Sequence, residues 1–158
     1  MRDKIKVLFL CHGNICRSPM AEFIMKDYVR KMGKEKEFFI ASSATSTEEI
    51  GNGVHRGTRG ILDRLGIDYS AKRAVRLTSQ DYDKYDYFIG MDYDNLYTMK
   101  YMLGGDSENK CSLLLDYTNR PGEVADPWYT HNFEDTYRDV KAGIEGLYKF
   151  LTEKKQNT

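Results

Sequence analysis

A cysteine and an arginine bracket a short loop near the start of the chain, and their side chains suit phosphoryl transfer. Cys11 and Arg17 are separated by five residues within the segment CHGNICRS. Gly13 and Asn14 tolerate unusual backbone angles, so the loop can turn its amide groups inward as a nest for an anion. Arg17 offers a planar guanidinium that can bind two phosphate oxygens, and Ser18 can donate its hydroxyl to a Cys11 thiolate. The segment therefore predicts a sulfur nucleophile at the base of a phosphate-binding loop.

The elements on either side of this loop are those that such a site needs. Residues 6–10 (KVLFL) form an apolar run typical of a fully buried strand. Ser18 as N-cap and Pro19 at the first helical position indicate a helix start, and Gly33 marks its end. The N-terminal end of that helix would point at the loop, which favours the thiolate form of Cys11. A lone cysteine is more often a packing residue, and this structural context favours the catalytic interpretation.

Strands and helices continue to alternate along the chain, which predicts a single α/β domain over residues 1–158. Further strands are expected at 37–42, 86–91 and 111–115, and further helices at 56–65, 94–103 and 133–151, the last capped by Asn132. Such alternation implies a parallel sheet of about four strands covered on both faces, a three-layer, doubly wound, flavodoxin-like fold. Ligands bind such sheets beyond the carboxyl ends of the strands. Only residues 154–158 are expected to fray.

A second motif lies far downstream of the cysteine loop. Asp126 and Pro127 are followed by Trp128 and Tyr129, and the stretches SSATS (42–46), EIGN (49–52), RG (56–57) and MD (91–92) lie between the two motifs. The cysteine loop itself continues as PMAE at residues 19–22. In these motifs and their order the chain resembles the low-molecular-weight protein tyrosine phosphatases, and the resemblance covers nearly its whole length.

The resemblance implies a mechanism and a substrate. Cys11 would attack phosphorus to form a phosphocysteine, Arg17 and the loop amides would stabilise the phosphoryl oxygens, and Asp126 would act as general acid and then as general base. The phosphate-binding residues expected are Cys11, His12, Gly13, Asn14, Ile15, Cys16, Arg17 and Ser18. The substrate pocket is expected to contain Ile15, Glu48, Trp128 and Tyr129. The substrate would be a phosphotyrosine-containing protein or a small aryl phosphate, with no cofactor and no metal.

The resemblance also implies supporting roles within the loop. Asn14 would hold the loop through side-chain hydrogen bonds, with Ser18 and Ser42 as partners. Cys16 would form a reversible disulfide with Cys11 and shield it from irreversible oxidation, whereas the alternative is a small packing residue. Sequence proximity permits this pairing and does not establish it.

Three positions depart from the pattern of the family. Glu48 replaces an aromatic residue that many relatives carry, and a carboxylate at the pocket rim would repel acidic peptides. The usual histidine near residue 72 is replaced by Lys72 or Ala71, depending on the alignment, so one support of the loop is altered. His12 within the loop is an exposed side chain or, when charged, a cation that favours a dianion.

Other activities compatible with this fold are a phosphoarginine phosphatase, an arsenate reductase and a phosphocarrier or phosphate-binding module. Relatives that prefer arginine phosphate carry threonine where this chain has Ile15, and a bulky apolar side chain favours a flat aromatic ring. Arsenate reduction needs additional relay cysteines, and Cys111 lies in an apolar run that predicts a core position. A carrier has no need of the acid that Asp126 would supply.

Composition narrows the class of protein further. The 24 basic and 24 acidic residues balance, which argues against a dedicated nucleic-acid binder. The sequence has no apolar run long enough to span a bilayer and no N-terminal pattern of a signal peptide. Its three cysteines, an odd number, favour a reducing compartment over a disulfide framework. These features predict a cytoplasmic protein without nucleic-acid or membrane partners, and we expect it to be a monomer.

Overall fold

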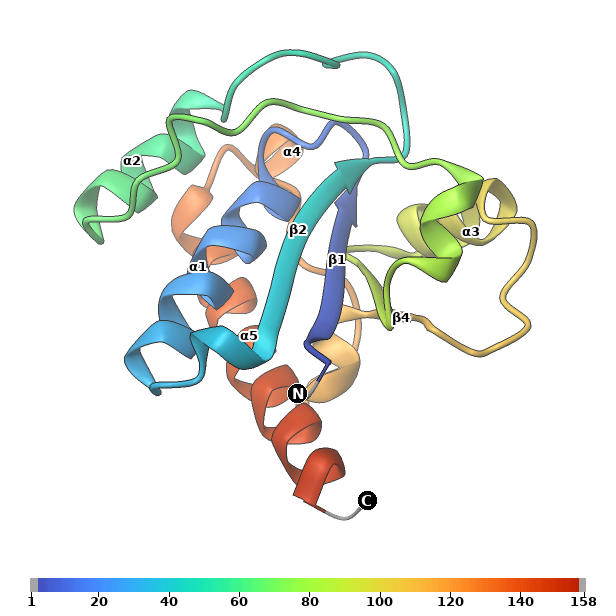
Figure 1. Ribbon diagram of the computed structural model, residues 1–158. Helices are drawn as coiled ribbons and strands as arrows, with labels where there is room; N and C mark the ends of the chain where they lie inside the picture. Colours follow the sequence, from blue (N-terminus) through green and yellow to red (C-terminus); the bar gives the residue numbers. More distant parts are fainter. Residues whose placement is uncertain (1–2, 157–158) are drawn as a thin grey trace.

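Four parallel strands form the sheet at the centre of the molecule (Figure 1). The computed structural model describes residues 3–156. The strands are β1 (Ile5–Cys11), β2 (Phe38–Ala44), β3 (Tyr87–Gly90) and β4 (Cys111–Leu113), in the spatial order β2-β1-β3-β4. This arrangement confirms the predicted α/β, doubly wound, flavodoxin-like sheet.

Helices cover both faces of the sheet and give the three predicted layers. One face is covered by α1 (Arg17–Lys31) and α5 (Phe133–Gln156), and α2 (Arg56–Arg64) packs against both of these helices (Figure 1). The other face is covered by α3 (Tyr93–Met102). The short helix α4 (Pro127–Thr130) leads into α5, and 3-10 turns occur at Glu35–Glu37, Ser79–Asp83 and Leu114–Tyr117.

Strand β1 is buried on both sides, as its continuous apolar sequence predicts. Val7 and Phe9 belong to the hydrophobic cluster beneath α1 and α5. Leu8 and Leu10 belong to the cluster beneath α3. Successive side chains of a strand point to opposite faces, so this central strand is shared between the two halves of the core.

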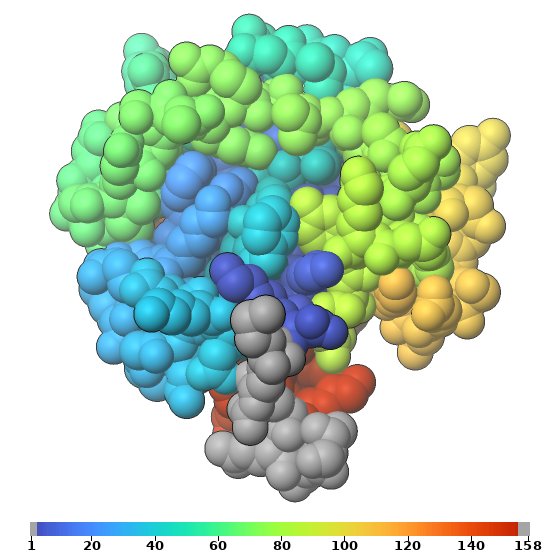
Figure 2. Space-filling view, viewed as in Figure 1, coloured from blue at the N-terminus to red at the C-terminus, as the bar shows by residue number. Residues whose placement is uncertain are grey.

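The carboxyl end of β1 is the place where this topology opens a crevice. The chain passes from β1 through α1 to β2 on one side, while β3 lies on the other side of β1. Residues 45–55 and 65–78 cross over this end of the sheet and cover the top of the molecule (Figure 1, Figure 2). Residues 45–55 are hydrogen-bonded to the end of β1, because the amide of Thr45 donates to the carbonyl of Cys11 over 3.0 Å.

Most element boundaries differ by one or two residues from those predicted, and three of the differences have a clear physical cause or consequence. Helix α1 begins at Arg17, which places Ser18 within the first turn and not at the N-cap. Strand β4 ends at Leu113 because its amide donates to the Asp116 carboxylate of the 3-10 turn that follows.

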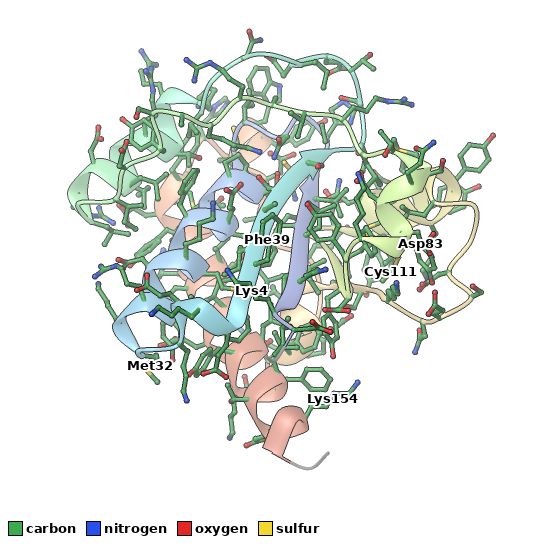
Figure 3. All side chains as sticks on the ribbon, in the orientation of Figure 1. Lys4, Met32, Phe39, Asp83, Cys111 and Lys154 are labelled. Atoms are coloured by element: carbon green, nitrogen blue, oxygen red, sulfur yellow. The ribbon has the colours of Figure 1, made fainter. Side chains whose placement is uncertain are left out.

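Helix α5 continues to Gln156, although the sequence predicts fraying from Lys154. The Lys154 ammonium (Figure 3) lies 5.8 Å from the ring centroids of Phe150, one turn earlier in α5, and of Tyr87 at the start of β3, and the Tyr87 contact holds the end of the helix against the sheet. Residues 157–158 of the predicted tail lie outside the described residues.

Two helical glycines provide a matched test of how α5 packs. A Cβ atom at Gly146 would overlap the backbone carbonyl of Tyr117, whereas one at Gly60 on α2 would meet no atom within 4 Å. We expect Gly146→Ala to lower the free energy of unfolding by about 1–3 kcal/mol through overpacking. We expect Gly60→Ala to raise it by about 0.5–1 kcal/mol, because alanine is the better helix former. Urea unfolding followed by circular dichroism measures both, and a Gly146→Ala protein as stable as the wild type would contradict this packing.

Candidate active site

The Cys11 sulfur lies where β1 ends and α1 begins. Its Sγ atom is 3.0 Å from the hydroxyl oxygen of Ser18, and it also accepts the Ser18 backbone N–H over 3.4 Å. Cys11 is buried, and its sulfur faces the N-terminal turn of α1. The sulfur therefore lies at the positive end of the helix dipole, next to a hydroxyl and a backbone amide.

Asn14 holds the loop between Cys11 and α1. Its backbone has a φ of 60°, the left-handed conformation that asparagine adopts more easily than most residues. Its Nδ2 donates to the hydroxyls of Ser18 and Ser42 over 2.8 and 2.9 Å, and its Oδ1 accepts the Val75 amide. The two serines implied by the family resemblance are therefore the partners of Asn14.

Behind Asn14, a buried carboxylate and a lysine continue this hydrogen-bond network. Ser42 donates its hydroxyl to Glu22 over 2.6 Å. Lys72 donates to the backbone carbonyl of Ser42 over 2.8 Å and lies 3.6 Å from the Glu22 carboxylate. Burial lowers the pKa of Lys72, while the Glu22 charge opposes this shift. Lys72 thus supplies a cationic donor behind the loop, at one of the two positions where the sequence predicts altered support.

Arg17 is turned toward two carboxylates at the edge of the site. Its Nη2 donates to Asp92 over 2.8 Å and to Asp126 over 3.4 Å, and its Nη1 donates to the backbone carbonyl of Val124. Burial opposes the charge, but Cys11, Asp126 and Asp92 raise the pKa of Arg17 above its ordinary value. The guanidinium is therefore a fixed cation. It joins the loop of residues 11–17 (the nucleophile loop) to residues 126–130 (the Asp126 segment).

Asp92 is a residue of the site to which the sequence assigns no role. It follows β3 and caps α3, because its Oδ1 accepts the Asn95 amide over 2.8 Å. Its other oxygen holds Arg17. The only sequence signal was its place in the stretch MD, directly after a predicted strand. Its pairing with an arginine 75 positions earlier depends on the fold.

Asp126 begins the short helix α4. Its Oδ1 accepts the amide of Trp128 over 3.0 Å, and Pro127 occupies the first helical position. Aspartate is a preferred N-cap and proline suits the position that follows it, so these two residues define the start of α4. The other carboxylate oxygen lies 3.4 Å from the Arg17 guanidinium. Asp126 is therefore placed beside the nucleophile loop.

The predicted residues meet around one cavity of about 490 Å³. Cys11 and Arg17 line it together with Asp126. The remaining predicted residues that line it are His12, Gly13, Ile15, Cys16, Glu48, Trp128 and Tyr129. Asn14 and Ser18 are buried behind the loop and make contacts that support it. The cavity thus has a sulfur and a guanidinium near an acid, with aromatic side chains alongside.

Acidic side chains gather at the rim of the cavity. Glu48 lies 3.0 Å from Nε2 of His12, and both side chains are largely exposed. Glu49 and Asp94 line the same cavity. His12, the one loop position with an exposed ring, therefore faces a carboxylate at the rim. The rim carries more negative than positive side chains, in contrast with the cationic Arg17 within.

The three cysteines are free thiols with different surroundings. Cys16 lines the cavity with Cys11, and burial, reinforced by the nearby Cys11, raises the pKa of Cys16 to about 12. Cys111 lies in β4 within the cluster beneath α3, and burial raises its pKa to about 12 as well (Figure 3). Cys111 is a core residue, as the sequence predicts.

Residues 3–156 contain no cluster of three or more histidine, cysteine or acidic side chains arranged to hold a metal ion. Within the same residues, no helix has the length and apolar character needed to cross a membrane.

Comparisons with known proteins place this site in a family. A family model described as low molecular weight phosphotyrosine protein phosphatase matches residues 6–157. The low molecular weight protein-tyrosine-phosphatase YfkJ of Bacillus subtilis is 40% identical over 154 residues, covering 96% of this chain and 99% of that protein. A protein of Saccharomyces cerevisiae, described as a low molecular weight phosphotyrosine protein phosphatase, is 35% identical and covers 88% of this chain and 90% of its own length.

Solved structures agree with the sequence comparisons. The crystal structure of YfkJ from Bacillus subtilis matches with a TM-score of 0.93 at 39% identity, covering 98% of both chains. The structure of SP-PTP, a low molecular weight protein tyrosine phosphatase from Streptococcus pyogenes, matches with a TM-score of 0.83 at 42% identity and covers 93% of each chain. With a family model that spans nearly all of its residues and with these relatives in sequence and structure, the chain belongs to the low molecular weight protein tyrosine phosphatase family.

Proposed function

We propose that this enzyme hydrolyses phosphotyrosine and other aryl phosphate monoesters through a phosphocysteine intermediate on Cys11. The observation that carries the proposal is that Cys11, Arg17 and Asp126 line one cavity, although they come from the end of β1, the start of α1 and the segment before α5. Each of the three supplies a different requirement of the reaction: a nucleophile, a cation for the phosphoryl oxygens and an acid.

In the first step the Cys11 thiolate attacks phosphorus. An S–P bond forms while the P–O bond to the phenol breaks, and the leaving oxygen takes the proton of Asp126. Arg17 and the inward-facing amides of the loop bind the oxygens of the transferring group, whose charge they stabilise in the transition state. Ser18 holds the sulfur from behind, 3.0 Å from Sγ.

In the second step water replaces the sulfur. The Asp126 carboxylate takes a proton from the water as it attacks phosphorus, the S–P bond breaks, and Cys11 leaves as a thiolate. Inorganic phosphate is released and Asp126 is again protonated for the next substrate. Asp126 thus acts as an acid in one step and as a base in the other.

The lining of the cavity supports an aryl substrate. Ile15, Trp128 and Tyr129 offer apolar and aromatic surface to a flat ring. The same apolar Ile15 gives a guanidinium no hydrogen-bond acceptor, which disfavours arginine phosphate. Arsenate reduction has little support because Cys111 lies within the core beneath α3. A phosphocarrier has little support because Asp126 lies in the cavity as a ready acid.

We also propose that the enzyme acts as a monomer in the cytoplasm.

We further propose that Cys16 is the redox partner of Cys11. Both cysteines line the same cavity, and all three cysteines of the chain are free thiols. A reversible disulfide would protect the nucleophile from further oxidation. A reducing compartment would then restore the active thiolate.

The nucleophile can be identified by alkylation. We expect iodoacetamide at pH 7 to label Cys11 at least about tenfold faster than Cys16 or Cys111, because the latter two remain thiols at this pH and the thiolate is the reactive form. Inorganic phosphate should slow the labelling of Cys11 and leave that of Cys111, which lies in the core beneath α3, unchanged. Peptide mass spectrometry after short exposures measures all three sites in one sample. Equal labelling of the three, with no protection by phosphate, would contradict the role of Cys11.

The role of Asp126 can be tested through the leaving group. Asp126→Asn keeps a good N-cap for α4 but cannot give a proton to phenolate. We expect first-turnover release of phenol from phenyl phosphate to fall by about 10²–10⁴-fold, and release from 2,4-dinitrophenyl phosphate to fall far less. Rapid-quench measurements give both rates.

Two further variants serve as controls for this test. Cys11→Ser should show no activity on either ester. Asp94→Ala removes a carboxylate from the same rim and should change both rates by a common factor. An equal loss on the two esters in Asp126→Asn would remove Asp126 as the general acid.

Glu48 should influence which peptides are accepted. Its exposed carboxylate at the rim repels acidic residues next to phosphotyrosine and attracts basic ones. In Glu48→Gln, the kcat/KM for basic phosphotyrosine peptides divided by that for acidic ones should therefore fall by about two- to fivefold. The change is expected to be this small because exposed charge pairs are weak. The shift should shrink at high salt. Glu153→Gln, an exposed change on α5, is the matched control, and an identical ratio in both variants would rule out this role.

A further inference from the structure

His55 connects the nucleophile loop to the start of α2. Its backbone amide donates to the carbonyl of Ile15 over 2.8 Å, and its own carbonyl accepts the amide of Arg59. The residue is half-buried. Any displacement of residue 55 therefore acts directly on the loop that carries Cys11.

The His55 side chain caps α2. Its Nδ1 accepts the backbone N–H of Gly57 over 3.1 Å. Serine, threonine, aspartate and asparagine are the usual N-caps, so a histidine at this position needs a further reason. An accepting Nδ1 also defines the state of the ring, because only a neutral imidazole with its proton on Nε2 offers a lone pair there.

The same ring touches the segment that carries Asp126. It stacks on Phe133, the first residue of α5, at 5.4 Å between centroids with an interplanar angle of 11°. It also meets the edge of Trp128 at 6.1 Å with an angle of 74°. Gly57 makes this approach possible, because a Cβ atom there would overlap the Phe133 ring. One imidazole thus lies against the residues on both sides of the loop that follows Asp126.

We propose that His55 is a positioning residue that holds the Asp126 segment in place against the nucleophile loop. The proposal rests on the proposed function, in which Asp126 must reach a phenolic oxygen above Cys11. His55 makes no contact with the reacting atoms and acts through Trp128 and Phe133. The backbone hydrogen bond to Ile15 ties residue 55 to the nucleophile loop, and the two aromatic contacts link its ring to the segment that carries Asp126.

The charges around His55 favour the neutral ring that makes this cap. Burial, followed by the Arg56 and Arg59 charges on α2, lowers the pKa of His55, while Glu49 from the rim opposes the shift. From α4 and α5 the ring contacts are Trp128 and Phe133, which carry no charge. A lowered pKa in the folded state means that the cap stabilises the fold above the ordinary value near 6.5 and is lost as pH falls through the lowered value.

Two substitutions separate the cap from the ring. His55→Asn keeps an N-cap acceptor and removes the aromatic contacts, whereas His55→Phe keeps a ring and removes the acceptor. A role confined to capping predicts that only His55→Phe has a measurable effect, and the effect is on stability. A positioning role predicts that His55→Asn changes the Asp126 segment while its stability stays close to that of the wild type.

The single tryptophan of the chain reports on this segment directly. We expect the fluorescence anisotropy of Trp128 to fall in His55→Asn and to stay at the wild-type value in His55→Phe. The emission of the wild-type protein should also change as pH falls through the lowered pKa of His55, where the neighbouring ring becomes charged, and His55→Asn should lack this transition. Wild-type anisotropy and an unaltered pH transition in His55→Asn would overturn the proposal, whatever the role of Asp126.

The kinetic readout is the dependence on the leaving group. In His55→Asn, first-turnover release from phenyl phosphate should fall about tenfold relative to release from 2,4-dinitrophenyl phosphate, as a partial loss of the acid requires. His55→Phe should keep the wild-type ratio. Gly146→Ala, destabilised far along α5, should also keep it, which excludes a general effect of stability. An unchanged ratio in His55→Asn, measured beside an Asp126→Asn variant that does change it, would overturn the positioning role and leave the proposed acid intact.

Discussion

The contact between the Cys11 sulfur and the first turn of α1 is the interaction on which the rest of the structure depends. A sulfur that carries charge next to a buried strand is stable only if donors and a positive dipole face it. Ser18 provides both a hydroxyl and an amide, and Asn14 fixes that hydroxyl in turn. The left-handed backbone of Asn14 is the local cost of closing the loop, and its three side-chain hydrogen bonds offset it.

Arg17 is a buried cation and must be neutralised by partners within the protein. Its side chain is only 4% exposed, so the guanidinium requires hydrogen-bonded carboxylates. Asp92 and Asp126 neutralise it, and both belong to segments that come much later in the chain. Arg17 therefore stabilises the fold in addition to its proposed role in binding the substrate phosphate. The same bonds bring the proposed acid to the nucleophile loop, so one ion-pair network both stabilises and assembles the site.

The sequence was sufficient to predict those parts of the molecule that local patterns determine. The run KVLFL identifies β1 because the strand is buried on both faces, and the CHGNICRS motif identifies the loop. The start of α1 was placed at Ser18 because serine usually caps helices, but here its hydroxyl is engaged by the sulfur. The roles of Asp92 and His55 could not be predicted, since Arg17 and Phe133, the residues that they contact, lie far away in the sequence. Helix α4 is too short to be stable by itself and depends on the Asp126 cap.

The two halves of the site are held by different kinds of interaction. The nucleophile loop is fixed by buried hydrogen bonds among polar side chains, with Asn14, Ser18 and Ser42 each at most 1% exposed. The Asp126 segment is held from one side by aromatic contacts, and its Trp128 and Tyr129 are 62% and 80% exposed. Exposed contacts of this kind place a segment at the low-stability end of a structure. A firmly held nucleophile loop suits the binding of a phosphate group, which is the same in every substrate. A more weakly held Asp126 segment suits the entry of different aromatic substrates and, after the phenol has left, the entry of the water that hydrolyses the phosphocysteine.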